Sequence, residues 1–204
     1  EFRNYILGFI FYKYLSEKIE TYADELLKED GINYQAIDEL SSTGKGLLDA
    51  VREEALERLG YFLYPSELFS VIAKRGSSNA NNFILEDLTQ ILSNIERSTM
   101  GYESEDGFEH LFDDLDLTSA KLGKTENAKN ILICKILTHL DEINFDLKNS
   151  DSDVLGDAYE FLISEFAAGA GKKAGEFYTP QQVSKILAKI VTNCKSKLKS
   201  VYDT

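Results

Sequence analysis

Residues 175–182 read Gly-Glu-Phe-Tyr-Thr-Pro-Gln-Gln and join an aromatic pair to a strong helix start. Thr179 is a good N-cap, Pro180 suits the first helical position, and Gln182 completes a capping box three residues after Thr179. The N-terminus of the helix that follows offers unpaired N–H groups and a positive dipole end, so it is a potential binding site for a carboxylate or phosphate. On the cap alone, an ordinary capped helix is the simpler interpretation. The surrounding sequence must decide between the two.

Both flanks of this segment predict helices. Downstream, apolar residues recur at helical spacing from Val183 to Val191. Upstream, a clear helix is predicted by Leu155, Ala158, Tyr159, Leu162, Ile163 and Phe166, and glycines at 169 and 171 end it. Residues 198–203 are predicted to form a β-strand. The pattern therefore predicts helices and one strand in this part of the chain.

The preceding sequence predicts helices alone. The chain opens with a helix that is apolar almost all round, which is typical of a buried helix. Further helices are predicted at 47–59, after Pro65, at 83–95 and at 128–143, with a loop at 76–79 and an acidic irregular stretch at 101–118. The fold class predicted is mainly α: an N-terminal helical bundle, followed by the opening helices and first strand of an α/β domain. The boundary is placed near residue 150, giving domains at 1–150 and 151–204.

Charge is distributed unevenly along the 204 residues of the chain. Residues 1–168 carry 15 basic and 33 acidic side chains, a net charge of −18, whereas residues 169–204 carry 7 basic and 2 acidic ones, a net charge of +5. A strongly acidic segment repels the phosphate backbone of DNA, so residues 1–168 are not expected to form a broad DNA-binding face by themselves. Whether the basic segment at 172–199 meets nucleic acid or solvent stays open.

Several other function classes are excluded or unsupported. Cys134 and Cys194 lie far apart without metal-type neighbours, and no metal site is predicted. Residues 42–46 fail the spacing of a phosphate-binding loop, and residues 169–174 follow a helix where a dinucleotide fingerprint requires a strand. No apolar run reaches the ~20 residues that a membrane span needs, so we expect a soluble, cytoplasmic protein without membrane contact.

Four segments, in this order, resemble the modification (M) subunits of type I restriction-modification systems, which are adenine-N6 DNA methyltransferases. They are residues 6–17 (ILGFIFYKYLSE), 111–117 (LFDDLDL), 155–163 (LGDAYEFLI) and 175–180 (GEFYTP). The GEFYTP segment, together with the helix predicted before it, is specific to this family, whereas the first two segments alone are weak indicators. The resemblance spans essentially the whole chain.

The resemblance implies that the GEFYTP segment lines a pocket for S-adenosyl-L-methionine. The Thr179 hydroxyl and the N–H groups of Gln181 and Gln182 would receive the methionine carboxylate, while Phe177 and Tyr178 would cover apolar parts of the cofactor. The cofactor-binding residues predicted are Glu176, Phe177, Tyr178, Thr179, Pro180 and Gln181. The partners implied are DNA and the specificity (S) and restriction (R) subunits of the same system.

The sequence departs from the family pattern in two ways. No glycine-rich turn follows Asp203, and the two prolines, Pro65 and Pro180, leave no catalytic N-P-P-[YF] motif. We therefore predict no catalytic residue, and expect the chain to be the N-terminal region of an M subunit that is inactive alone. The alternative is a stand-alone acidic helical interaction module without catalysis. DNA target and oligomeric state stay open.

Overall fold

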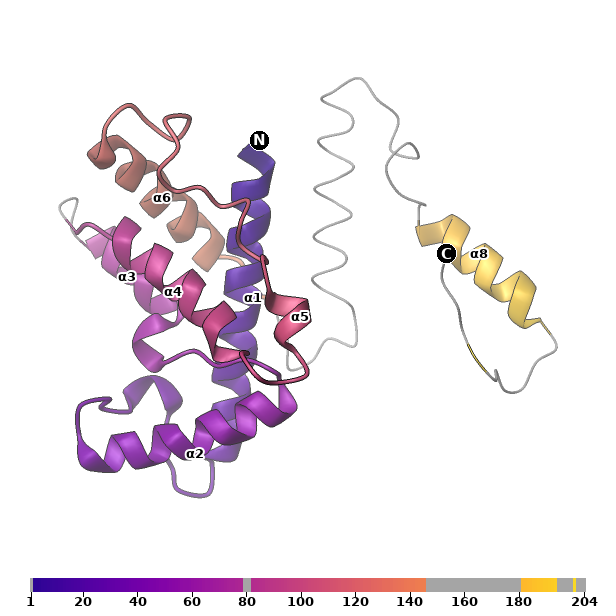
Figure 1. Ribbon diagram of the computed structural model, residues 1–204, viewed down its shortest axis with the longest axis horizontal. Helices are drawn as coiled ribbons and strands as arrows, with labels where there is room; N and C mark the ends of the chain where they lie inside the picture. Colours follow the sequence, from indigo (N-terminus) through magenta and orange to yellow (C-terminus); the bar gives the residue numbers. More distant parts are fainter. Residues whose placement is uncertain (1, 79–81, 146–180, 194–199, 201–204) are drawn as a thin grey trace. The chain divides into compact units, whose positions relative to one another are not determined.

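The computed structural model describes residues 2–78, 82–145, 181–193 and 200. The chain divides into two compact units, Glu1–Asp157 and Ala158–Thr204. The described part contains helices and no strand, which confirms the mainly α prediction (Figure 1). The helices are α1 (Phe2–Leu26), η1 (Tyr34–Ala36), α2 (Ser42–Arg58), η2 (Pro65–Glu67), α3 (Phe69–Ser78), α4 (Leu85–Ser98), α5 (Glu105–Phe108), α6 (Glu126–Asp141) and α8 (Gln181–Thr192).

Helix α1 is the central element of the first unit. It contacts α2, α3 and α6, and in Figure 1 α2 crosses it near its C-terminal end. Phe9, Ile19 and Ala23 have no exposed surface, so one stripe along the helix is completely buried. The prediction of a buried opening helix is therefore confirmed. At about 1.5 Å per residue, its 25 residues span most of a small domain.

Three buried tyrosines attach α1 and its neighbours to the extended segment 61–64 and to η2. Tyr12 donates its hydroxyl to the Glu67 carbonyl at 2.5 Å, and Tyr61 donates to the Leu15 carbonyl at 2.8 Å. Tyr34 donates to the Leu63 carbonyl. Only the Leu63 carbonyl lies in the segment without regular structure, where the Tyr34 hydroxyl supplies a donor inside the core. The other two bonds join α1 to this segment and to η2.

Helix α2 begins at Ser42, five residues before the predicted start. The Ser41 hydroxyl accepts the Gly44 N–H at 2.9 Å, which is the N-cap bond. Gly44 sits close to the preceding turn, because a Cβ built on it would lie 1.9 Å from the Asp38 carbonyl oxygen. Gly44, which makes this helix start resemble a turn in the sequence, is thus required by local packing, whereas no atom lies within 4 Å of a Cβ built on Gly46. The residues that resemble a phosphate loop are its first turn.

Helix α3 continues through Ser78, so the loop predicted at 76–79 is wrong for Gly76 to Ser78. The reason is tertiary packing, since α3 lies closely against α6. A Cβ at Gly76 would lie 3.0 Å from the Cys134 Sγ, which shows that glycine permits this approach. Packing therefore overrides the turn preference of Gly-Ser-Ser.

Helix α4 starts two residues later and ends three residues later than predicted. The side chain of its N-cap residue, Ile84, makes no capping hydrogen bond. A buried asparagine of α6 instead forms hydrogen bonds with the backbone at this helix start. Asn130 Oδ1 accepts the Ile84 N–H at 2.9 Å, and Asn130 Nδ2 donates to the Asn82 carbonyl at 2.9 Å. The buried residues of α4 form one stripe: Leu85, Leu88, Ile91, Leu92 and Ile95.

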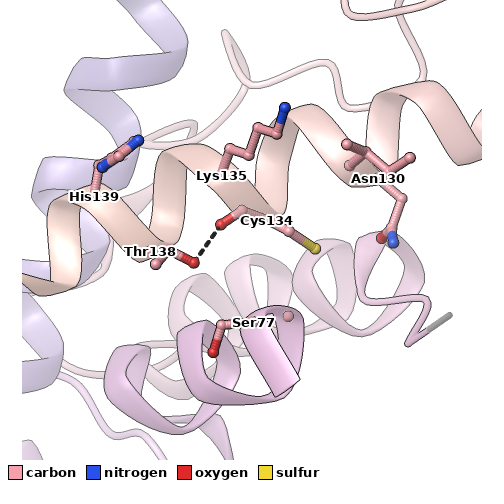
Figure 2. A pocket seen from close by; sticks show the side chains of 8 residues that line it. Ser77, Asn130, Cys134, Lys135, Thr138 and His139 are labelled. Atoms are coloured by element: carbon pink, nitrogen blue, oxygen red, sulfur yellow. Dashed lines mark hydrogen bonds between the residues drawn. The ribbon is translucent and has the colours of Figure 1, made fainter. Parts of the chain in front are cut away.

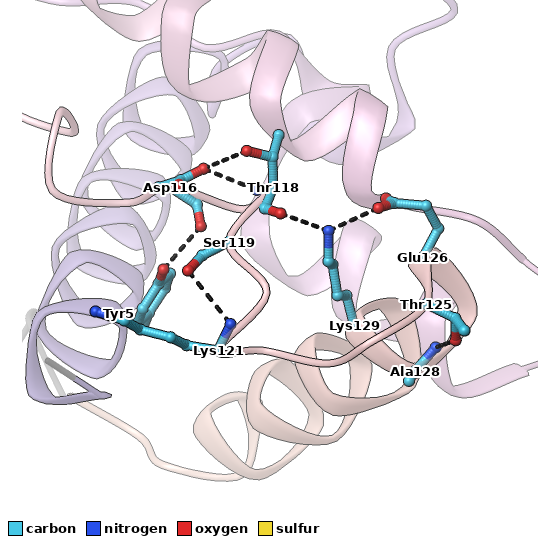
Figure 3. A network of polar contacts seen from close by, with 9 residues as sticks. All are labelled: Tyr5, Asp116, Thr118, Ser119, Lys121, Thr125, Glu126, Ala128 and Lys129. Carbon is cyan, nitrogen blue, oxygen red and sulfur yellow. Dashed lines mark hydrogen bonds and ion pairs between the residues drawn. The ribbon is translucent and has the colours of Figure 1, made fainter.

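The acidic stretch between α4 and α6 is irregular, as predicted, apart from the four-residue α5. A polar network fixes its second half (Figure 3). Tyr5 of α1 donates its hydroxyl to the Asp116 carbonyl at 2.7 Å. The Lys129 ammonium of α6, which is buried, donates to the Thr118 carbonyl and to Glu126 Oε1. The network thereby joins this stretch to both α1 and α6.

In the second unit, the described residues form α8. It spans Gln181–Thr192, which confirms the helix predicted from Val183 to Val191, whereas its predicted start at Thr179-Pro180 lies outside the described residues. The helix predicted around 155–166 lies outside the described residues, as does the strand predicted at 198–203 except Ser200. No helix in the described part is long and apolar enough to cross a membrane.

Candidate functional site

The predicted cofactor segment ends where α8 begins. Glu176, Phe177, Tyr178, Thr179 and Pro180 lie outside the described residues, whereas Gln181 is the first residue of α8. The first turn of α8 contains no acidic side chain. The helix's own residues therefore place no negative charge at this end of its dipole. This is compatible with an anionic ligand group, and the roles of the six predicted residues stay predictions.

The apolar face of α8 is exposed in the structure. Val183 is the least exposed of its five large apolar residues, at 44% of its surface, and Ile190 is the most exposed, at 65%; the others are Ile186, Leu187 and Val191. Lys185 and Lys189 are exposed as well. A helix with a continuous apolar stripe of this kind is built to pack against another layer of structure.

A pocket between helices α3 and α6 has a volume of about 380 Å³ (Figure 2). In the figure the Cys134 thiol points from α6 toward α3, and Thr138 donates its hydroxyl to the Cys134 carbonyl at 2.8 Å. Burial raises the pKa of the Cys134 thiol, which keeps it protonated and a poor nucleophile. His139, at the rim, is 80% exposed. These features describe an apolar surface pocket rather than a catalytic centre.

A second pocket, of about 200 Å³, lies between α2, the segment 62–67 and α4. We call it the arginine pocket; its lining residues are Arg52, Phe62, Tyr64, Glu67, Asn94, Arg97 and Ser98. The Arg52 guanidinium carbon lies 5.8 Å from the centre of the Phe62 ring. Phe62 and Tyr64 meet edge to face, with ring centres 4.9 Å apart. The pocket thus combines two cations with an aromatic wall.

Glu67 is the single carboxylate among the residues that line the arginine pocket. Its Oε2 accepts the Tyr64 N–H at 2.9 Å, and its Oε1 accepts from Asn94 Nδ2 at 2.6 Å. Burial raises the pKa of Glu67, and these two hydrogen bonds oppose the shift. Glu67 therefore connects the segment 62–67 to α4 and fixes this wall of the pocket.

No group of three or more His, Cys, Asp or Glu side chains that would hold a metal ion occurs among the described residues. His110 and His139 are both strongly exposed and contact only nearby acidic side chains in the ion pairs recorded. Both side chains are therefore largely solvated.

Comparison with known proteins assigns both parts of the chain. The family model described as HsdM N-terminal domain matches residues 1–140, and the model described as N-6 DNA Methylase matches residues 150–204. The chain belongs to the methylase (M) subunit family of type I restriction-modification systems. It corresponds to the N-terminal region of such a subunit. The alternative of an unrelated interaction module finds no support in these comparisons.

Individual relatives agree with this family. The type I restriction enzyme MpnII methylase subunit of Mycoplasma pneumoniae is 35% identical over 207 residues, which cover 100% of this chain and 38% of that protein. The MjaVIII methylase subunit of Methanocaldococcus jannaschii is 30% identical over 191 residues, covering 91% of this chain and 28% of that protein. The chain thus spans well under half the length of these M subunits.

A solved M subunit has the same fold. The crystal structure of the type I restriction-modification system methyltransferase subunit from Streptococcus thermophilus superposes with a TM-score of 0.74 at 33% identity. The match covers 96% of this chain and 40% of that one. The helical architecture described above is therefore that of an M subunit's N-terminal region.

The structure also relates the first two segments that resemble M subunits. Leu115, from segment 111–117, lies against Gly8, from segment 6–17, because a Cβ on Gly8 would lie 2.5 Å from Leu115 Cδ1. In addition, Tyr5 bonds the Asp116 carbonyl and Asn4 Nδ2 donates to Asp114 Oδ2 at 3.1 Å. The two segments therefore form one packing unit, although about a hundred residues separate them.

Proposed function

We propose that the full-length protein transfers a methyl group from S-adenosyl-L-methionine to adenine N6 in DNA. The family membership supports this proposal, and so does the match of residues 150–204 to the N-6 DNA methylase model. The single structural observation that carries it is the helix α8 (Gln181–Thr192), which follows the GEFYTP segment in the chain. The N-terminus of a helix that follows this segment would offer N–H groups to an anionic group of the cofactor.

The predicted site residues divide into two kinds of contact. The Thr179 hydroxyl and the N–H groups of Gln181 and Gln182 would bind the methionine carboxylate at the N-terminus of α8. Phe177 and Tyr178 would cover the apolar parts of the cofactor, and Pro180 would fix the first turn of the helix. Glu176 would bond a polar group of the cofactor or a nearby backbone amide. The cofactor itself supplies the activated methyl group.

The exposed face of α8 fits an N-terminal region that continues into a larger domain. The M subunits to which the chain is similar are longer than this chain by more than a factor of two. The sheet of a methyltransferase domain would cover Val183, Ile186, Leu187, Ile190 and Val191 and remove them from water. At about 25 cal/mol per Å² of apolar surface, this burial would attach α8 firmly to the rest of the domain.

The helical unit would act in substrate handling. Methyltransferases that modify a base must extrude it from the stack, which requires protein surfaces that close on the duplex. In this scheme the helical unit packs on the specificity (S) subunit or closes over the DNA. The restriction (R) subunit joins the same complex, and the complex works in the cytoplasm.

The proposal is tested by methyl transfer with the full-length protein, its S subunit, plasmid DNA and radiolabelled S-adenosyl-L-methionine. We expect label in DNA that digests to N6-methyladenosine, and none when the S subunit is omitted. Label in a methylated cytosine, or no label in DNA, would contradict the proposed reaction. The 204-residue chain alone is expected to transfer no methyl group, and detectable transfer by it would contradict that part.

A further inference from the structure

The arginine pocket has a property that the methyl transfer reaction does not use: two unpaired cations beside an aromatic wall. Arg52 extends from α2 and Arg97 from α4, and both side chains are exposed. Among the described residues neither guanidinium is in an ion pair with a carboxylate, although the first unit is rich in acidic side chains. Both therefore keep their hydrogen-bond donors for a group from outside.

The carboxylate inside the pocket does not occupy these donors. Both oxygens of Glu67 accept hydrogen bonds already, from the Tyr64 N–H and from the Asn94 amide. The wall is also fixed on its other side, because Ser98 Oγ accepts the Phe62 N–H at 2.9 Å. Since these bonds hold Phe62 and Tyr64 in place, the pocket is formed before any ligand arrives, which lowers the entropic cost of binding.

The position of Arg52 favours a carboxylate ligand. Its guanidinium carbon lies 5.8 Å from the centre of the Phe62 ring, a cation–π distance that uses none of its N–H groups, so these donors stay available. The planar guanidinium edge matches the two oxygens of a carboxylate in a bidentate pair. A volume of about 200 Å³ suits one side chain and is small for a nucleotide.

Charge decides which macromolecule presents the oxyanion. The first unit, residues 1–157, carries 15 basic and 31 acidic side chains, a net charge of −16, which disfavours a polyanionic DNA backbone at this pocket over a distance of about a Debye length, ~8 Å at physiological salt. A protein surface that is neutral or basic overall, with one protruding acidic side chain, meets no such barrier. We propose that Arg52 and Arg97 form a recognition site for an Asp or Glu side chain of a partner protein.

The test measures ligand binding at the two arginines by NMR on the purified full chain. The probe is acetyl-glutamate amide, which carries one carboxylate, and the matched neutral compound is acetyl-glutamine amide. We expect saturable shifts of the Arg52 and Arg97 Nε–Hε signals with acetyl-glutamate amide, with a dissociation constant on the order of 10 mM, and no saturable shifts with the glutamine compound. Inorganic phosphate and a short DNA duplex are titrated in parallel.

Arg52→Gln and Arg97→Gln are each expected to weaken binding about tenfold, because each removes charge-assisted hydrogen bonds. Arg58→Gln, at the end of α2 and outside this pocket, is the control and should leave the affinity unchanged. All three variants are accepted only if their circular dichroism and unfolding midpoints match the unchanged protein. The proposal is overturned if acetyl-glutamate amide gives no saturable shift, or if phosphate or the duplex binds these arginines as strongly. It is likewise overturned if Arg58→Gln weakens binding as much as the other two variants do.

Discussion

Leu115 packs directly against Gly8 of α1, so closely that a Cβ on the glycine would lie 2.5 Å from Leu115 Cδ1 and 2.7 Å from its Cγ. Leu115 is buried, and its segment is tied to α1 and α6 by the bonds of Tyr5 and Lys129. The leucine therefore has little room to withdraw. Helix α1 therefore needs glycine at position 8, because a larger residue would prevent the acidic stretch between α4 and α6 from packing against the helix.

This contact predicts opposite effects for two glycine substitutions in helices. Gly46 lies in α2 with no atom within 4 Å of a built Cβ, so Gly46→Ala should stabilise the protein by about 0.5–1 kcal/mol through helix propensity. Gly8→Ala gains the same propensity but overlaps Leu115, which costs roughly 1–3 kcal/mol, and should destabilise overall. Urea unfolding of both variants measures the difference. Equal stabilisation by the two substitutions would show that the Gly8–Leu115 contact is absent.

Leu115→Ala supplies the control for that prediction. It destabilises by itself, since it removes buried methyl groups. In its background, Gly8→Ala should become neutral or stabilising, because the overlapping atoms are gone. If Gly8→Ala costs as much with Ala at 115 as with Leu, the cause of the destabilisation lies elsewhere.

The buried hydroxyl of Tyr61 should contribute measurably to stability. Tyr61→Phe keeps the ring but leaves the Leu15 carbonyl, inside α1, without this donor. We expect a loss of about 1–2 kcal/mol in the free energy of unfolding. Tyr102→Phe, at a 46% exposed position, should change it by less than about 0.5 kcal/mol. Comparable losses in both variants would contradict a specific role for the buried bond.

Lys13 combines an ion pair with aromatic packing at a buried site. Its ammonium pairs with Glu17 and lies 5.4 Å from the Phe69 ring centre and 5.2 Å from that of Phe145, with 3% of the side chain exposed. Lys13→Met keeps the aliphatic stem between the rings and loses only the charge, whereas Lys13→Ala also leaves a cavity. We therefore expect Lys13→Ala to cost at least about 1 kcal/mol more than Lys13→Met.

The control for Lys13 is Lys18, an exposed lysine of the same helix whose ammonium lies 5.4 Å from the Tyr14 ring centre. Lys18→Ala should be close to neutral in the same denaturant titration. Equal costs for Lys13→Met and Lys13→Ala would mean that the stem is not packed as described.

Glu67 predicts a pH dependence of stability. Burial raises its pKa in the folded protein above the value in the unfolded chain, so the carboxylate form is disfavoured by folding. Its contribution is most favourable below the ordinary Glu pKa of about 4.3, and declines as the pH rises through the raised value. Relative to the Glu67→Gln variant, which does not titrate, the unchanged protein should lose stability as the pH rises from about 4 toward neutral.

The measurement is the difference in unfolding free energy between the two proteins across that range. Glu53→Gln, at an exposed position of α2, serves as the matched control and should give no trend of this kind. A difference that is constant with pH, or that grows in favour of Glu67 toward neutral pH, would contradict the burial of this carboxylate.

Periodicity predicted the existence of most helices, and local packing set their ends. The apolar stripes of α1, α4, α6 and α8 were readable because their spacing is regular. The start of α2 and the end of α3 were not, because Gly44 and Gly76 are turn residues by preference and are kept in helices by contacts with Asp38 and Cys134. Such contacts depend on the tertiary fold, which a local pattern does not contain.

The functional surfaces divide in the same way. The cofactor segment could be predicted because Gly175 to Pro180 are consecutive and match a family signature. The arginine pocket has no such signal, since Arg52 and Arg97 lie on different helices and Tyr64 and Phe62 are typical of a buried strand-like segment. Only the packing of α2 against the segment 62–67 and α4 brings these side chains to one pocket.

The most direct test of the account is a calorimetric titration of the full-length protein with S-adenosyl-L-methionine. The account predicts that Thr179→Val combined with Phe177→Ala abolishes binding, because it removes the hydroxyl and the ring assigned to the cofactor. Thr192→Val is the matched control at the opposite end of α8, where the hydroxyl donates to the Ala188 carbonyl, and it should bind normally. Unchanged affinity in the Thr179/Phe177 variant, or no binding by the full-length protein itself, would contradict the assignment of this segment as the cofactor site.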